Sequence, residues 1–267
     1  MTSTLSIQDR ATRGLRFDDL PVIDAHAHLG PFAMIHAPYS DAAGLLASMD
    51  QIGITLTCLS SSWAICSDYR RGNDEVAAAV RAHPGRFAGY AVINPHYPDD
   101  IELELNRCLD NLDFWAVKLH PAVHEYPPDG PAYHRVYAQI QERGGVILSH
   151  SFGDAQTLGR LGAAYPKVTF IQAHSGGAYD GRTPSPFAPL LRDRDNIYMD
   201  VTLSIVRFGG IETLVEAASA DRLLFATDVP FLDNAHQLGR ITHARIDEAD
   251  KRKILGLNMR GLLSRQG

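Results

Sequence analysis

The chain has 267 residues, the length of one large domain or two small ones, and its hydrophobic fraction of 45% is enough for a sizeable core. Lysine and arginine total 25 against 31 acidic residues, a formal charge of −6 that argues against a nucleic-acid or acidic-membrane partner. No run is apolar enough to span a bilayer, and the first residues lack the apolar segment of a secretory signal.

The three cysteines show neither the spacing of a metal site nor that of a redox pair. Cys58, Cys66 and Cys108 are therefore expected to be reduced thiols. With the composition, this predicts a cytoplasmic protein that acts on a small molecule. Whether it forms a homo-oligomer is left open, because no exposed apolar stripe marks an interface.

Eight short apolar runs, rich in β-branched and aromatic residues and bounded by Gly, Pro or Asn, are predicted to be strands. They begin at Pro21, Ile54, Phe87, Phe114, Gly144, Val168, Asn196 and Arg222. Segments of helical character separate them. Residues 73–80 join an acidic first turn to strong helix formers, and residues 99–111 place Ile101, Leu105 and Leu109 on one face.

Strands that alternate with helices pair in parallel through right-handed crossovers, and near-continuous apolar strands are covered on both faces. Eight such units predict a single (β/α)8 TIM barrel over residues 1–267, with an N-terminal extension (1–20) and a C-terminal helical tail (247–267). A doubly wound open sheet is the alternative. It usually carries a glycine-rich phosphate loop after the first strand, and Leu29-Gly30-Pro31-Phe32 is not one.

Metal-competent side chains end four of the predicted strands. His26 and His28 end the first, His150 the fifth, His174 the sixth and Asp228 the eighth. Taken singly, each has an ordinary structural explanation, because histidines at strand ends often make hydrogen bonds and aspartates often cap helices. Together they meet at the catalytic face of a barrel, where residues distant in sequence converge. The pattern therefore predicts a metal-dependent enzyme.

Alternate residues of a strand share a face, which predicts that Asp24 points the same way as His26 and His28, and Lys118 the same way as His120. A buried carboxylate and a buried ammonium both need partners. We hypothesise that Lys118 neutralises Asp24 or a carboxylate of the ligand.

Several of these strand ends carry family motifs. The segments DAHAHLG, VKLHP, LSHS, QAHSGG, FATDVP and ILGLNMRGLL resemble the amidohydrolase superfamily. Within it, the chain is most similar to the amidohydrolase-2 group of metal-dependent barrel hydrolases and decarboxylases. The resemblance extends from about Pro21 to Leu263.

The resemblance implies that His26, His28, His150 and Asp228 hold one divalent metal, usually zinc. It implies that His174 is a catalytic or substrate-contacting histidine and not a permanent ligand, and that Asp228 also transfers protons. Manganese, cobalt and iron accept the same ligands. In binuclear members of the superfamily the fourth strand supplies a bridging carboxylate, often a carboxylated lysine, so a second metal here would need a modified Lys118.

We expect a hydrolase that cleaves a lactone, ester or amide. A metal-bound water of lowered pKa would attack, Asp228 would transfer its proton, and His174 would polarise the carbonyl. The alternative is a non-oxidative decarboxylase of an unsaturated or aromatic acid, and the third hypothesis is a non-catalytic binding barrel. The predicted substrate-binding residues are Lys118, His120, Trp63, Tyr69 and Arg207.

Overall fold

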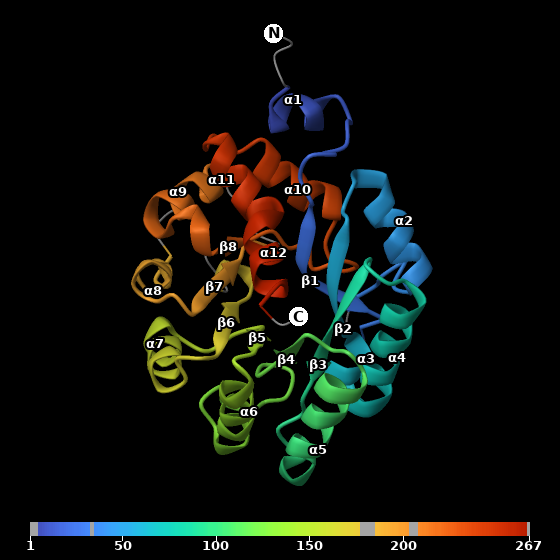
Figure 1. Cartoon of the computed structure of the whole chain (residues 1–267), viewed down its shortest axis with the longest axis vertical. Helices are drawn as coiled ribbons and strands as arrows, with labels where there is room; N and C mark the ends of the chain where they lie inside the picture. The colour runs from blue at the N-terminus through green and yellow to red at the C-terminus, as the bar shows by residue number, and fades with distance from the viewer. Residues whose placement is uncertain (1–4, 33–34, 177–184, 203–207, 266–267) are drawn as a thin grey trace.

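The computed structural model describes residues 5–32, 35–176, 185–202 and 208–265. In this part of the chain, eight parallel strands neighbour one another in sequence order, with helices outside them (Figure 1). The protein is a single (β/α)8 TIM barrel, as predicted, and not an open doubly wound sheet. The strands are β1 (Ile23–Leu29), β2 (Leu56–Ser61), β3 (Phe87–Val92), β4 (Ala116–Leu119), β5 (Val146–Ser149), β6 (Thr169–Gln172), β7 (Ile197–Asp200) and β8 (Leu223–Leu224).

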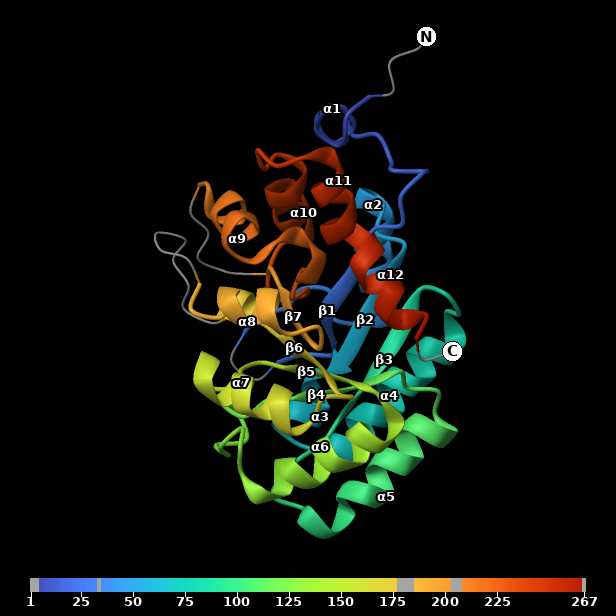
Figure 2. The same ribbon diagram turned by 60° about the vertical axis from the view of Figure 1, so that its left-hand side comes forward.

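Helices follow the strands around the outside of the barrel in both views (Figure 1, Figure 2). Their bounds are α1 (Ile7–Thr12), α2 (Ala42–Ile52), α3 (Ser62–Cys66), α4 (Tyr69–Ala82), α5 (Ile101–Asn106), α6 (Pro131–Arg143), α7 (Ala155–Ala164), α8 (Ala188–Asp193), α9 (Gly210–Ala218), α10 (Asn234–Thr242), α11 (Glu248–Arg252) and α12 (Asn258–Leu263). Shorter helical turns are η1 (Pro98–Asp100), η2 (Arg107–Asn111), η3 (His174–Gly176), η4 (Ala220–Arg222) and η5 (Lys253–Leu257).

Aspartate side chains begin several of these helices. Asp41, Asp68, Asp154 and Asp233 each accept a hydrogen bond from a backbone N–H in the first turn of α2, α4, α7 and α10. Such a cap satisfies an N–H group that has no partner within the helix. Local sequence therefore determines where these helices begin, and with them the exits of the preceding strands.

The barrel closes between β1 and the segment that follows the short strand β8. Ala25 N–H donates to Phe225 O (2.9 Å), Asp228 N–H to His26 O (2.8 Å), and His28 N–H to Val229 O (2.8 Å). This seam joins the first and last strands of the barrel. It also lays the chain around Asp228 directly against the predicted histidine pair.

Two apolar layers hold the barrel together. A large one lies between strands and helices, and a smaller one unites residues from all eight strands, as only the barrel interior allows. Met259 and Leu262 of α12 belong to the interior cluster together with Ile23, so the C-terminal tail packs against the barrel. Ile7, at the start of α1, is buried in the larger apolar layer, so the described part of the N-terminal extension also packs against the barrel. The predicted bounds of the extension and the tail stay predictions.

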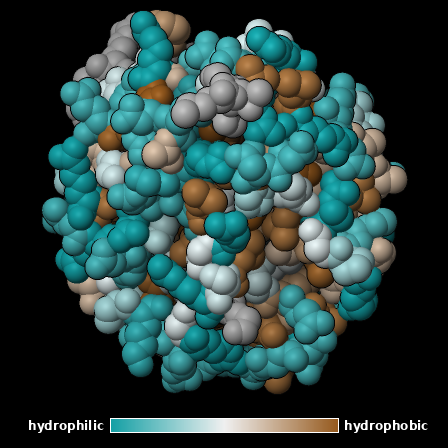
Figure 3. All heavy atoms as spheres, turned by 45° about the horizontal axis from the view of Figure 1, so that its top comes forward, coloured by the Kyte–Doolittle hydropathy of each residue, from teal (hydrophilic) through white to brown (hydrophobic). Residues whose placement is uncertain are grey.

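Hydrophilic side chains cover most of the face drawn in Figure 3, and apolar ones show between them near the centre and in smaller scattered patches. Among the described residues, no helix combines the length and the hydrophobicity needed to cross a membrane.

The loop after β4 is fastened to its surroundings by His124, a buried residue. Its Nε2 lies 3.1 Å from Ile65 O and its Nδ1 lies 3.1 Å from the Tyr133 hydroxyl. Because a carbonyl oxygen only accepts, Nε2 carries the hydrogen and Nδ1 accepts from Tyr133. Burial lowers the pKa of His124 from 6.5 to about 4, partly opposed by the hydrogen bond to Ile65.

His124 predicts a pH dependence of stability. Because its pKa is lower in the folded state, the unfolded state binds the proton more tightly, and the free energy of unfolding falls as pH drops from about 6.5 to about 4. The contribution is up to roughly 3 kcal/mol. Urea unfolding of metal-free wild type and His124→Gln across this range should give curves that converge as pH falls. A difference that stays constant with pH would contradict this role.

A second prediction concerns Gly256 in η5, where the helical tail passes close to the start of β1. A Cβ at this position would lie 1.8 Å from the carbonyl oxygen of Pro21, a backbone atom that cannot move aside. We expect Gly256→Ala to cost about 3 kcal/mol or more and to lower Tm by several degrees. Gly261→Ala in α12 is the matched control, because its Cβ meets nothing within 4 Å. Equal Tm values for the two variants would refute the packing argument.

Candidate metal centre

The barrel mouth brings together His26, His28 and Asp228. The Nε2 atoms of the two histidines are 3.2 Å apart, and Asp228 Oδ1 lies 3.2 Å from Nε2 of His28 and 3.7 Å from Nε2 of His26. Ligands on one tetrahedral ion with bonds of about 2.1 Å are separated by about 3.4 Å. The three donor atoms therefore already have the spacing of ligands that share a metal ion.

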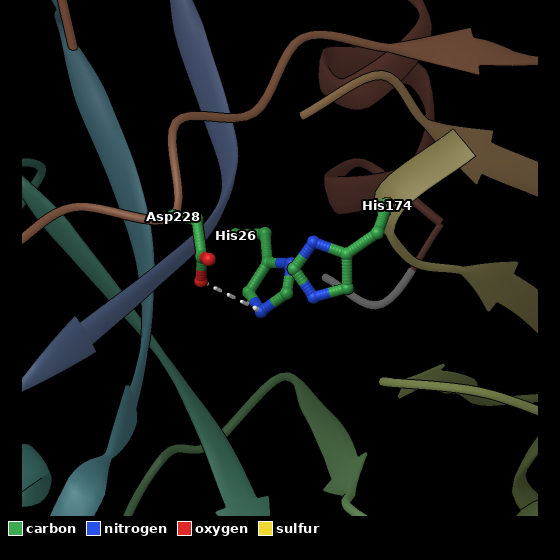
Figure 4. A group of neighbouring side chains, drawn as sticks. All are labelled: His26, His174 and Asp228. Carbon is green, nitrogen blue, oxygen red and sulfur yellow. Dashed lines mark ion pairs between the residues drawn. The ribbon is translucent and has the colours of Figure 1, made fainter. Parts of the chain in front are cut away.

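His174 lies on the other side of His26. One donor atom from each of His26, His174 and Asp228 falls within 4.8 Å of the others, and Figure 4 shows the three side chains facing one another. His150 lies beyond, with its Nδ1 3.1 Å from Nε2 of His174. All five predicted residues thus gather at the mouth. The division of roles between His150 as ligand and His174 as catalytic residue stays a prediction.

Burial keeps the imidazoles in the form that binds metals. It lowers the pKa of His150 to about 3 and that of His174 to about 4, and it holds the pKa of His26 and of His28 below the ordinary value. Burial alone would raise the pKa of Asp228, but the hydrogen bond with His28 and nearby positive charge keep it low. Neutral nitrogens beside a carboxylate are the donor set that a divalent cation requires.

Asp200, at the end of β7, is a site residue that the sequence analysis missed. Its Oδ2 lies 2.9 Å from Nδ1 of His26, and its Oδ1 accepts a hydrogen bond from the backbone N–H of His174 (2.9 Å). A carboxylate on Nδ1 orients an imidazole and leaves Nε2 free for a metal. Asp200 lies inside the seventh predicted strand, and in the structure it is the last residue of β7.

Lys118 points into the mouth, as predicted, and is fully buried. Its expected pairing with Asp24 is wrong, because Asp24 is bound instead to backbone and hydroxyl groups of His26 and Thr227. The Lys118 Nζ lies 2.6 Å from Nε2 of His26, and burial lowers the pKa of Lys118 to about 8. A metal bound to Nε2 of His26 would require the flexible side chain of Lys118 to move away. The distances among the donor atoms of His26, His28 and Asp228 would need no change.

The remaining predicted substrate-binding residues are placed differently. His120 stacks on His150 with ring centroids 4.1 Å apart, next to the cluster. Trp63 lies below the guanidinium of Arg71, 5.0 Å from its carbon, and Tyr69 donates to Asp100 Oδ2 (2.8 Å). The described contacts of Trp63 and Tyr69 do not reach the histidine cluster, so their substrate roles stay predictions. Arg207 lies outside the described residues.

An aromatic wall at the edge of the cluster was also missed. The ring of Phe231 lies 5.0 Å from that of His28 and 5.2 Å from that of Phe32. Phe231 follows Asp228 by three residues, and its N–H donates to Asp228 O (3.0 Å). The turn that presents the carboxylate therefore also presents a flat apolar surface.

Comparisons with known proteins identify the family to which the chain belongs. The Amidohydrolase family model (Amidohydro_2) matches residues 23–264. The chain is 26% identical to the gamma-resorcylate decarboxylase of Polaromonas sp. over 237 residues, which cover 69% of this chain and 72% of the relative.

Two solved structures have the same fold. A 2,6-dihydroxybenzoate decarboxylase from Rhizobium superposes with a TM-score of 0.73 at 18% identity over 93% of this chain and 100% of the other. A dihydroxybenzoic acid decarboxylase from Polaromonas sp., with bound manganese and 2-nitroresorcinol, gives a TM-score of 0.71 at 19% identity over 92% and 97%. Because the family model spans most of the sequence, this protein belongs to the amidohydrolase family.

Proposed function

We propose that the protein is a metal-dependent, non-oxidative decarboxylase of a hydroxylated aromatic carboxylic acid. The observation that carries the proposal is the position of Phe231, whose ring flanks His28 at the edge of the metal-competent cluster. An aromatic ring packs favourably against such a face. The names of the related decarboxylases support the same class, and they favour it over the hydrolase that we expected from the sequence alone.

His26, His28 and Asp228 would hold one divalent ion, with His150 as the fourth ligand suggested by the sequence. When bound, the metal would act as a Lewis acid toward the carboxylate and neighbouring hydroxyl of the substrate. Zinc is our first expectation from the ligand types, and manganese is the ion named for one related structure. Asp200 would hold the imidazole of His26 in position through Nδ1.

Asp228 is suited to move the proton. Its lowered pKa keeps it ionised, so it can take the proton of the substrate hydroxyl and deliver it to the ring carbon that carries the carboxylate. That carbon becomes tetrahedral, its bond to the carboxylate breaks, and the electron pair returns to the ring as CO2 leaves. The ammonium of Lys118, once displaced from His26, supplies the positive charge that an anionic substrate needs in a buried site.

The metal centre is tested by metal analysis of the purified chain. We expect about one divalent ion per chain, and binding at least 100-fold weaker in the double variant His26→Ala, His28→Ala, because two of the donors are gone. His236→Ala, which removes an exposed histidine of α10, should bind as the wild type does. Two ions per chain would bring a modified Lys118 into the site, and no uptake of any divalent ion would refute the centre.

The reaction is tested by incubating the metal-loaded enzyme with 2,6-dihydroxybenzoate and other hydroxybenzoates while CO2 and the decarboxylated phenol are measured. Asp228→Asn should lower kcat by about 10²–10⁴-fold, as loss of a general acid or base does. A panel of lactones, esters and amides run in parallel tests the competing hydrolase. Hydrolytic products without CO2 from any acid would overturn the decarboxylase and leave the metal centre intact.

A further inference from the structure

Asp228 lies in a turn with an uncommon backbone conformation. Its φ of 58° is in the left-handed region, which residues other than Gly, Asn and Asp rarely adopt. In this conformation the carboxylate points back at Nε2 of His28, 3.2 Å away. The position of the carboxylate beside the histidine pair therefore depends on the backbone of this turn.

Asp24 accepts hydrogen bonds from the backbone just before this turn. The pairing of β1 with β2 shifts register between Asp24 and Ala27. Asp24 Oδ1 accepts hydrogen bonds from the N–H groups of His26 (3.1 Å) and Thr227 (2.9 Å). One fully buried carboxylate oxygen thus joins the backbone of a predicted ligand to the residue that precedes Asp228.

The Thr227 side chain connects Asp24 to the backbone just after Asp228. Its hydroxyl donates to Asp24 Oδ2 (2.6 Å) and accepts from the N–H of Val229 (3.1 Å). The residues immediately before and after Asp228 are therefore tied to the same buried carboxylate, directly or through one hydroxyl. Both side chains are inaccessible to solvent, so water cannot replace these bonds.

We propose that Asp24 and Thr227 are positioning residues for Asp228, and that through this turn they determine how tightly the site binds a divalent metal. The inference rests on the metal centre of the proposed function, but not on the type of reaction. Buried groups that orient ligands contribute to metal affinity without touching the metal. Neither residue contacts the substrate in this assignment.

The test is a titration of the metal-free full-length protein with Co²⁺, whose absorption spectrum reports the geometry of its ligands. Thr227→Val removes the hydroxyl and keeps the shape of the side chain. We expect Co²⁺ to bind about 10–100-fold more weakly, with a changed spectrum, and Asp24→Asn to act in the same direction. Thr227→Ser restores the hydroxyl and should bind within about twofold of wild type.

Tyr90→Phe is the matched control, because it removes another buried hydrogen bond to β1, from the Tyr90 hydroxyl to Ala25 O (2.8 Å), and leaves the hydrogen bonds between Asp24 and Thr227 in place. It should leave Co²⁺ affinity and spectrum unchanged. Circular dichroism of each variant checks folding, and Thr227→Val decides if Asp24→Asn does not fold.

Three outcomes would overturn the proposal. The first is a folded Thr227→Val that binds Co²⁺ with wild-type affinity and spectrum. The second is an equal loss in Tyr90→Phe, which would mean a general loosening of the barrel. The third is wild-type protein that binds no Co²⁺, which would refute the metal centre and, with it, the positioning role of Asp24 and Thr227.

Discussion

The closure of the barrel between β1 and the segment after β8 is the constraint on which the site depends. Three backbone hydrogen bonds join segments about 200 residues apart. They run from Ala25 N–H to Phe225 O, from Asp228 N–H to His26 O and from His28 N–H to Val229 O. Strand β8 itself is only two residues long, so the seam is made largely by chain that is not regular strand. The donor atoms of His26, His28 and Asp228 are close because this seam is closed, and an open sheet would separate them.

The seam encloses several ionisable groups that water cannot reach. Lys118, Asp200 and Asp24 are fully buried, and each would be costly without a partner. Asp24 and Asp200 meet this requirement with hydrogen bonds from backbone and side chains, whereas Lys118 has His26 as its close contact. A divalent ion among these groups would add positive charge near Asp24 and Asp200. It would take the position that the Lys118 ammonium now has at Nε2 of His26. The charge distribution of the mouth is therefore suited to a cation.

Sequence alone predicted the barrel and the gathering of five side chains at its mouth, because strand periodicity and strand-end position are local signals. The expected pairing of Lys118 with Asp24 was wrong, because Asp24 binds the backbone and hydroxyl groups of His26 and Thr227 at a point where the register of β1 shifts. Asp200 was missed because it was taken as part of a strand and not as a strand end. The wall formed by Phe231 and Phe32 depends on how two loops pack, which spacing along one chain does not encode. Trp63 and Tyr69 were proposed for the substrate wall by residue type alone, and their contacts with Arg71 and Asp100 leave that role a prediction.

The same donors serve hydrolysis and decarboxylation, so the metal site by itself does not select between them. In hydrolysis the proton taken by Asp228 comes from water and goes to a leaving group. In decarboxylation it goes to a carbon, which must be held face-on to the carboxylate for the transfer to occur. In the proposed decarboxylase, the flat apolar surface of Phe231, carried by the same turn as the carboxylate, would hold a ring in that relation to Asp228. The proposed proton donor and the aromatic surface share one backbone segment, so any change that moves the turn would disturb both together.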